Sequence, residues 1–245
     1  MNNTTLATWA AAIWNTLESS GVDPRRVFAK QNLEFEQLCE ADARVSVSAM
    51  SQIWRDSVAE TGNEAFGLLV PAHCSSLTFH SVGIALEASS SLREALQRVE
   101  KISHMVSDAA DIRSVEQPDG DVVMRWLMEA EALNEITDQA IDAFMLSWVL
   151  NLPKNSIKNI RMMREEPKDP SLWERSFQVP VVFSTAENQI VFNGGALDAP
   201  VTTANPAVAM AGERIAMDYL QRMKTASISL RVEAELVRLL EGGRA

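Results

Sequence analysis

The stretch FQVPVVFSTAENQIVFN, from Phe177 to Asn193, is the most informative part of the chain for the fold. Two short apolar runs flank a polar segment, and none of the side chains forms a recognisable catalytic set. Apolar runs on either side of a polar turn are typical of a β-hairpin. The stretch therefore predicts two strands that pair with each other late in the chain.

Other strands are expected upstream of this stretch. Residues 111–128 (DIRSVEQPDGDVVMRWLM) hold two β-prone runs around Pro118, Asp119 and Gly120, and glycine tolerates the positive φ of a tight turn. Residues 156–163 predict a further strand, and residues 77–80 predict a short strand that leads into a helix. Together these segments predict a small, mostly antiparallel sheet.

The rest of the chain is patterned for helices. Trp9, Ile13 and Leu17 recur at helical spacing, and Ser91 with Glu94 forms the S-x-x-E box that satisfies free N–H groups at a helix start.

Further helical segments are apolar all round, begin at a proline, or have an apolar face. We expect helices over these segments: residues 140–150, 171–177, 205–225 and 228–240. The fold class predicted is α+β, with many helices packed around a small sheet.

The composition excludes several classes of protein. The chain has 245 residues, 47% hydrophobic and 22% charged, and its formal net charge is −11. Such an acidic chain lacks the broad basic surface with which proteins displace counterions from nucleic-acid phosphates. No signal peptide and no 18-residue apolar run is present, so we expect a cytoplasmic protein that does not enter a membrane.

Motifs for catalysis and for metal binding are missing from the sequence. Nucleotide-binding, serine-hydrolase and zinc-protease signatures are all absent, so an enzyme is not predicted. Cys39 and Cys74 are far apart, and His73 and His80 near Cys74 lack a fourth partner. We expect no metal and no cofactor.

A small-molecule site is the kind of site that remains. Aromatic residues fall on segments expected to pack together, and a few polar residues stand beside them in the sequence. An apolar cavity with a few convergent polar groups is typical of a ligand site. The candidate ligand-binding residues are Phe79, His80, His104, Arg125, Trp126, Phe144 and Trp148. The alternative is that these aromatic side chains only fill the core.

The chain resembles a known family along nearly its whole length. The matching segments are residues 21–33, 43–70, 82–109 and 176–206, of which the last is the most specific. Its F-x-x-P-V-x-F run, polar turn, apolar strand and later leucine and proline resemble the effector domain at the N-terminus of AraC-type transcriptional regulators, in the ornithine-utilisation-regulator-like subgroup. Ser90, Ser91 and Leu92 stand where that pattern usually has a proline.

The resemblance implies a domain that senses a small-molecule effector and forms a homodimer in a bacterial cell. It implies residues 1–226 as the sensing and dimerisation domain, and residues 227–245 as a linker and the first helix of a DNA-binding domain. DNA would be contacted only through the helix-turn-helix part of that second domain, which does not follow in this chain. Truncation and a stand-alone sensor both remain open.

Two further hypotheses remain beside a ligand sensor. One is a protein-interaction or dimerisation module with no small-molecule ligand, which would use an exposed helix. The other is an enzyme, which would need a cleft with perturbed acid or base groups.

Overall fold

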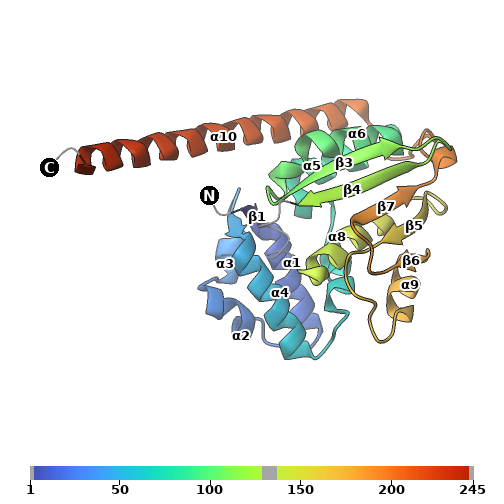
Figure 1. Cartoon of the computed structure of the whole chain (residues 1–245), viewed down its shortest axis with the longest axis horizontal. Coiled ribbons are helices and arrows are strands. Elements are labelled where there is room, and N and C mark those ends of the chain that lie inside the picture. The colour runs from blue at the N-terminus through green and yellow to red at the C-terminus, as the bar shows by residue number, and fades with distance from the viewer. Residues whose placement is uncertain (1–2, 129–136, 243–245) are drawn as a thin grey trace.

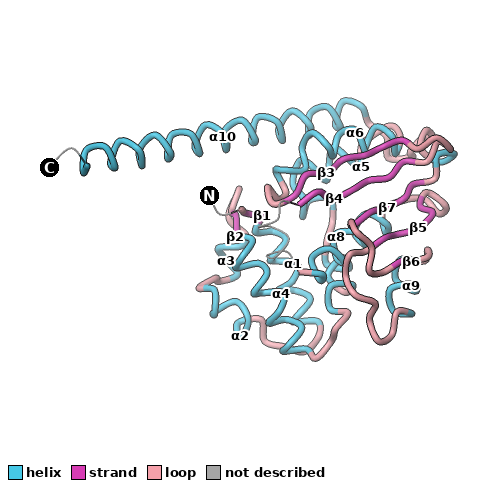
Figure 2. The backbone as a smooth tube through the Cα atoms, viewed as in Figure 1, coloured by secondary structure: helices cyan, strands magenta, loops and turns pink. Residues whose placement is uncertain are grey.

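The computed structural model describes the backbone of residues 3–128 and 137–242, and side chains as far as residue 226. The fold is α+β, with helices around two small and mostly antiparallel sheets (Figure 1). Helices of the N-terminal quarter form one side of the body, the larger sheet forms the other, and α8 lies between them (Figures 1 and 2). The predicted fold class is confirmed.

The N-terminal side is a helical cluster closed by a two-stranded sheet. Its elements are β1 Thr4–Leu6, α1 Ala7–Ser19, α2 Arg25–Phe28, α3 Phe35–Leu38, β2 Arg44–Ser46 and α4 Val47–Thr61. Ser46 caps α4 by accepting a hydrogen bond from the Ala49 N–H at 3.2 Å, and Gly62 ends the helix at φ 63°. Buried Trp9, Ile13 and Leu17 confirm the helical spacing read from the sequence.

A run of short helical turns connects this cluster to the sheet. It comprises η2 Phe66–Leu68, η3 Val70–His73 and η4 Ser76–Phe79, followed by α5 His80–Glu87. The strand expected over residues 77–80 is therefore wrong. Ser75 caps the turn with Thr78 in a reciprocal capping box, which favours helical over extended backbone.

The helix α6 Leu92–Ile102 begins as its sequence predicts. The Ser91 side chain accepts from the Glu94 N–H at 3.2 Å, while the Glu94 carboxylate accepts from the N–H of Ser90 at 2.6 Å. Both contacts satisfy amides that the helix itself leaves free. The turn η5 Ser103–Met105 follows.

The larger sheet corrects the expectation drawn from the opening stretch. Its strands are β3 Ala110–Glu116, β4 Val122–Met128, β5 Ile157–Arg161, β6 Val181–Val182 and β7 Asn188–Phe192, in the order β3-β4-β7-β5-β6. β6 and β7 do not pair with each other, because β5 lies between them, antiparallel to β7 and parallel to β6. The predicted hairpin at residues 177–193 is wrong, whereas the hairpin of β3 and β4 is confirmed.

Helices cover the sheet and complete its core. Sheet residues such as Trp126 and Phe192 pack with Met145 and Leu146 of α8 Asp138–Leu150, and with Trp173 and Phe177 of α9 Ser171–Phe177. The all-round apolar pattern of residues 140–150 is thereby explained, since α8 is packed between two layers.

The last element is α10, Pro206–Gly242, which is one helix where the sequence predicted two. It packs along α5 and α6 and then extends beyond the body (Figure 1). Nothing between residues 225 and 228 breaks the helix, since the segment lacks glycine and proline.

Among the described residues no single helix could span a membrane. Only Phe66–His73 and Ser76–Glu87, counted together across a 102° bend, reach the needed length and composition.

Candidate functional site

A cavity of about 690 Å³ lies between the N-terminal helical cluster and the larger sheet. Side chains from α1 and α4 wall one end, α5 and α6 wall one side, and α8 walls the side opposite. The volume falls in the range of about 300–1,000 Å³ that holds small organic ligands. The fold thus provides room for a molecule of that kind.

Aromatic rings form much of the wall. They come from separate elements: Trp9 of α1, Trp54 of α4, Phe79 of η4, Trp126 of β4, and Phe144 and Trp148 of α8. Phe79 contacts Trp9 with ring centroids 5.3 Å apart, and Phe144 meets Trp126 edge-on at 5.6 Å. These contacts hold the rings in fixed orientations around the cavity.

Helical periodicity places the polar groups of α8 on the cavity side. Ser147 and Trp148 lie three and four residues after Phe144, Asn151 lies four residues after Ser147, and all four residues line the cavity. The Ser147 hydroxyl donates back to the Ala143 carbonyl at 2.8 Å. Ser147 is buried, and because this bond uses its hydroxyl proton, the hydroxyl offers a ligand only an acceptor oxygen.

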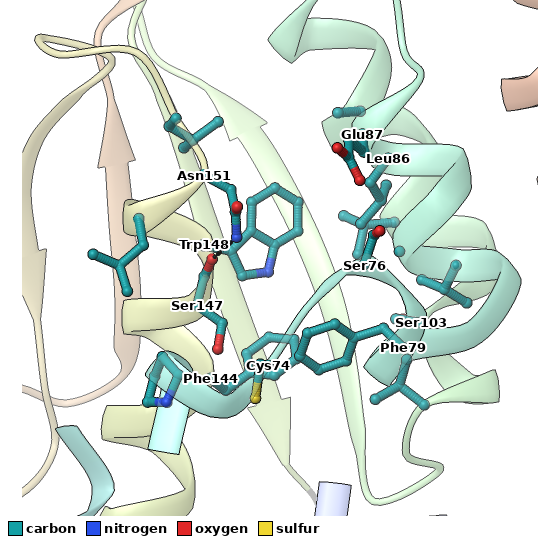
Figure 3. Close-up of a pocket in the computed structure, with 18 of the residues that line it drawn as sticks. Cys74, Ser76, Phe79, Leu86, Glu87, Ser103, Phe144, Ser147, Trp148 and Asn151 are labelled. Atoms are coloured by element: carbon teal, nitrogen blue, oxygen red, sulfur yellow. Dashed lines mark hydrogen bonds between the residues drawn. The ribbon is translucent and has the colours of Figure 1, made fainter. Parts of the chain in front are cut away.

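The charged residues that line the cavity are at exposed positions. Among the described lining residues, Glu87 and Lys154 are the only ones whose side chains carry a full charge, and both are exposed. Figure 3 shows Glu87 of α5 and Asn151 at the end of α8 on opposite sides of the cavity. The end near Trp9 and Trp54 is buried.

Cys74 lies beside the rings of Phe79 and Phe144 (Figure 3). Burial raises the pKa of its thiol to about 12, and the Sγ donates weakly to the Val70 carbonyl at 3.5 Å. A thiol with such a pKa stays neutral and is a poor nucleophile. Cys74 therefore behaves as a small apolar wall residue.

The structure brings together four of the seven candidate residues from the sequence. Phe79, Trp126, Phe144 and Trp148 line the cavity. Their role in binding remains a prediction, since a lining position alone does not show a ligand.

The polar candidates lie elsewhere. Arg125 lies 3.6 Å from Glu187 and points to the opposite face of the sheet from its neighbour Trp126, because side chains alternate along a strand. His104 Nε2 is 2.8 Å from Asp111, at a half-exposed position. His80 starts α5 at φ 52° and is not among the lining residues. Arg125, His104 and His80 were candidates because they stand near aromatic residues in the sequence. Such proximity does not place a side chain in the cavity.

Several lining residues were not singled out from the sequence. They include Trp9, Trp54, Ser103, Ser147 and Asn151. The spacing of Ser147 and Asn151 from Phe144 would have indicated the last two, since these residues share a helix face. Trp9 and Trp54 gave no such signal, because their meeting with α8 depends on the packing of distant elements.

Among the side chains that the structure describes, in residues 3–128 and 137–226, no cluster of three or more metal-ligating groups occurs. Asp108 accepts hydrogen bonds from the N–H and the hydroxyl of Thr4 at 2.5 and 3.2 Å. The Asp108 side chain thus links β1 to the loop before β3.

Comparisons with known proteins agree with this architecture. The structure is similar to the crystal structure of the transcriptional regulator CdpR from Pseudomonas aeruginosa, with a TM-score of 0.60 and 17% sequence identity. The match covers 82% of this chain and 59% of that one, so the chain spans less than two thirds of that regulator. A search of curated proteins found no match.

A family model matches residues 21–201, which is most of the chain and includes every element from α2 to η6 Gly194–Ala196. The model is described as the arabinose-binding domain of AraC transcription regulators, at their N-terminus. The chain therefore belongs to the family of N-terminal arabinose-binding domains of AraC transcription regulators.

Proposed function

We propose that this chain is the ligand-sensing part of a bacterial AraC-type transcription regulator, with the cavity as its effector site. The observation that carries the proposal is that α5 and α6 wall the cavity and also support α10. A ligand in the cavity would thus press on two helices that each touch α10 directly. A cytoplasmic location and a homodimeric state are proposed with this function.

The first connection runs through α5. Val82 and Leu86 of α5 line the cavity, while Ser81 and Ala85 lie against Gly212 of α10. A Cβ at Gly212 would stand 2.8 Å from the Ser81 carbonyl oxygen, so the two helix backbones are in close contact. A shift of α5 would have to displace α10.

The second connection runs through α6. Leu92, Ala95 and Val99 of α6 line the cavity. On another side of the same helix, Arg98 bonds to Glu213 of α10 at 3.0 Å. A movement of α6 that widens or narrows the cavity would change this contact.

A ligand shifts such an equilibrium only by binding one arrangement better than the other. The apolar packing under α10 involves Val82 and Ala85 of α5 together with Ala216 and Tyr219 of α10. Packed interfaces of this kind have discrete arrangements, which favours a two-state response.

We propose that DNA contact belongs to another domain of the regulator, with residues 227–245 as the linker and first helix leading to it. The α10 backbone is helical as far as Gly242, which supports a rigid link; residues 243–245 lie outside the described residues. The helix from Asn205 to Thr225 is the proposed relay or dimer contact.

The alternative proposal is an interaction module without a ligand, acting through α10. Exposed apolar side chains on this helix favour it: Val208, Met210, Ile215 and Met217 are between 40% and 60% exposed. Such a module would not respond to small molecules.

A thermal-shift screen over metabolites of several chemical classes separates the two proposals. A ligand at 100 times its Kd adds about 2.7 kcal/mol of stability, which raises the Tm of a chain this size by roughly 5–10 °C. The sensor proposal predicts such a rise for at least one class. No rise for any class, together with measurable self-association through α10, would favour the interaction module.

A further inference from the structure

Resting on the proposed sensory function, we infer that the effector is a largely apolar, uncharged amphiphile with one polar end, and not a sugar or an amino acid. The inference follows from the distribution of charge, hydrogen-bonding groups and aromatic surface along the cavity.

Among the described residues, none that lines the cavity interior carries a charge that could meet a charged ligand. Its two charged lining residues, Glu87 and Lys154, are at exposed positions, and Cys74 is neutral. A zwitterionic amino acid placed against Trp9, Trp54 and Phe144 would bury two charges without partners. Each buried ion loses several kcal/mol of hydration that only a paired opposite charge offsets.

Two of the hydroxyls that line the cavity interior already donate to backbone carbonyls of the protein. The Ser147 hydroxyl donates to Ala143 at 2.8 Å, and the Thr5 hydroxyl donates to the Val106 carbonyl at 3.0 Å. Asn151 is exposed and donates its amide to the Ser147 carbonyl at 2.8 Å. A sugar would have to bury several hydroxyls, and each one left unpaired costs about 1–3 kcal/mol.

Apolar surface, in contrast, is abundant and pre-arranged. Six aromatic residues from five different elements line the cavity, joined by aliphatic side chains of α5 and α6: Val82, Leu86, Leu92 and Val99. Burial of apolar ligand area against such walls contributes roughly 25 cal/mol per Å². An alkyl chain or an apolar ring system matches this surface.

The open end suits one polar group. Glu87 and Asn151 lie there on opposite sides at exposed positions (Figure 3), and Lys154, three residues after Asn151, is also exposed, so a hydroxyl or amide at that end keeps its contact with water. One carboxylate and one ammonium give no net charge to attract a charged head group. A neutral head is therefore favoured over a carboxylate or an amine.

The test uses the four tryptophans that line the cavity as reporters: Trp9, Trp54, Trp126 and Trp148. Octan-1-ol, decan-1-ol and dodecan-1-ol are titrated below their solubility limits, beside dodecanoate, dodecylamine, L-arabinose and L-ornithine. We expect saturable changes in tryptophan fluorescence with the alcohols, with affinity rising about 4-fold per methylene. Dodecanoate and dodecylamine should bind more weakly than dodecan-1-ol.

A matched pair of variants locates the binding. Ser147→Leu adds apolar volume inside the cavity and should weaken dodecan-1-ol binding at least 10-fold. Ser19→Leu changes an exposed serine of α1 whose hydroxyl makes the same backbone contact four residues earlier, and it should leave binding unchanged. If Ser147→Leu does not fold, Ala95→Leu on α6 fills the same cavity from the opposite wall.

The outcomes separate this inference from the sensory function. In one outcome, L-arabinose or L-ornithine binds, the Ser147→Leu variant loses that binding, and the alcohols do not bind. The effector is then not an apolar amphiphile, while the sensory function is supported. If dodecan-1-ol binds equally to wild type and to both cavity-filling variants, the cavity is not its site and the inference is overturned. If no probe and no metabolite binds, both proposals fail.

Discussion

The guanidinium of Arg98 on α6 bonds to the Glu213 carboxylate on α10 at 3.0 Å, and its side chain is only 7% exposed. The same group reaches Glu94 at 2.6 Å and the Ser89 hydroxyl at 2.9 Å. Arg98 thus joins the start of α6, the end of α5 and α10. Since α5 and α6 also wall the cavity, Arg98 connects the helices around the cavity to α10.

Replacing Arg98 with methionine should remove the ion pair between α6 and α10 without altering the wall of the cavity. The variant keeps much of the apolar side-chain volume but leaves Glu213 without its buried partner, so we expect a loss of about 1.5–3 kcal/mol in the free energy of unfolding. Urea unfolding measures that loss. Ligand affinity should remain, while any ligand-dependent change at α10 should shrink.

Lys101→Met is the matched control. Lys101 contacts the same Glu213 at 3.3 Å but is 58% exposed, and exposed ion pairs contribute below about 1 kcal/mol. Equal losses for the two variants would contradict the special role of the buried arginine.

Gly212→Val should push α10 away from α5. The added side chain would stand within 3.0 Å of the Ser81 carbonyl and of Ala85, which are fixed parts of α5. We expect destabilisation of about 1–3 kcal/mol by overpacking, with faster proteolysis of α10. Met210→Val places the same β-branched residue at a 60% exposed position and should cost about 0.5 kcal/mol. If both variants behave alike, the close approach of the helices is unimportant.

The Glu94 carboxyl should make part of the free energy of unfolding sensitive to acid. The Arg98 guanidinium and the Ser90 N–H lower the pKa of this carboxyl from 4.5 to about 2. A carboxyl with a lowered folded pKa stabilises the protein above its unfolded pKa, and that contribution is lost as the pH falls through the folded value.

The stability difference between wild type and Glu94→Gln should therefore be constant above about pH 5 and shrink between pH 4.5 and 2. Chemical unfolding across that range measures it. A difference that stays constant down to pH 2 would mean that Glu94 has an ordinary pKa.

Arg164 forms an ion pair with Asp142 of α8, in which Asp142 is fully buried and Arg164 is 11% exposed, and Arg164 also lies 4.4 Å over the ring of Trp173. Burial raises the pKa of Asp142 to about 7, Asp138 on the same helix raises it further, and Arg164 opposes the rise. A raised folded pKa means that stability falls as the pH climbs from about 4 towards that value.

Arg164→Met removes the opposing charge, so the folded pKa of Asp142 should rise beyond about 7. The wild type should lose stability at about 1.4 kcal/mol per pH unit between pH 5 and 6 and level off above about pH 7, whereas the variant should keep that slope up to about pH 8. Arg161→Met, at an exposed position three residues earlier, should leave the slope unchanged. If stability depends on pH in the same way in Arg164→Met and in wild type, Arg164 does not lower the pKa of Asp142.

Local signals in the sequence were enough for many elements of the fold. The Pro118-Asp119-Gly120 turn predicted the β3–β4 hairpin, and the Ser91–Glu94 box predicted the start of α6. The stretch from Phe177 to Asn193 behaved differently. Its apolar runs do form strands, but β5 lies between them. That arrangement depends on long-range pairing, which a local pattern does not encode.

The site was predictable only as far as its aromatic residues. Phe144 and Trp148 followed from the apolar character of α8, and Trp126 followed from its strand. Arg125 was chosen for its place beside Trp126, although strand alternation sends the two to opposite faces. Trp9 and Trp54 reach the cavity through the packing of α1 and α4, which sequence spacing within one helix does not reveal.

Amide hydrogen exchange across residues 206–223 of α10, with and without saturating dodecan-1-ol, tests most directly whether the cavity controls this helix. The account predicts a change in protection along this segment in wild type, and no change in Ser147→Leu at the same concentration. Tryptophan fluorescence in the same samples establishes that the cavity is occupied. Saturated binding with unchanged exchange along α10 would contradict the coupling of the cavity to α10.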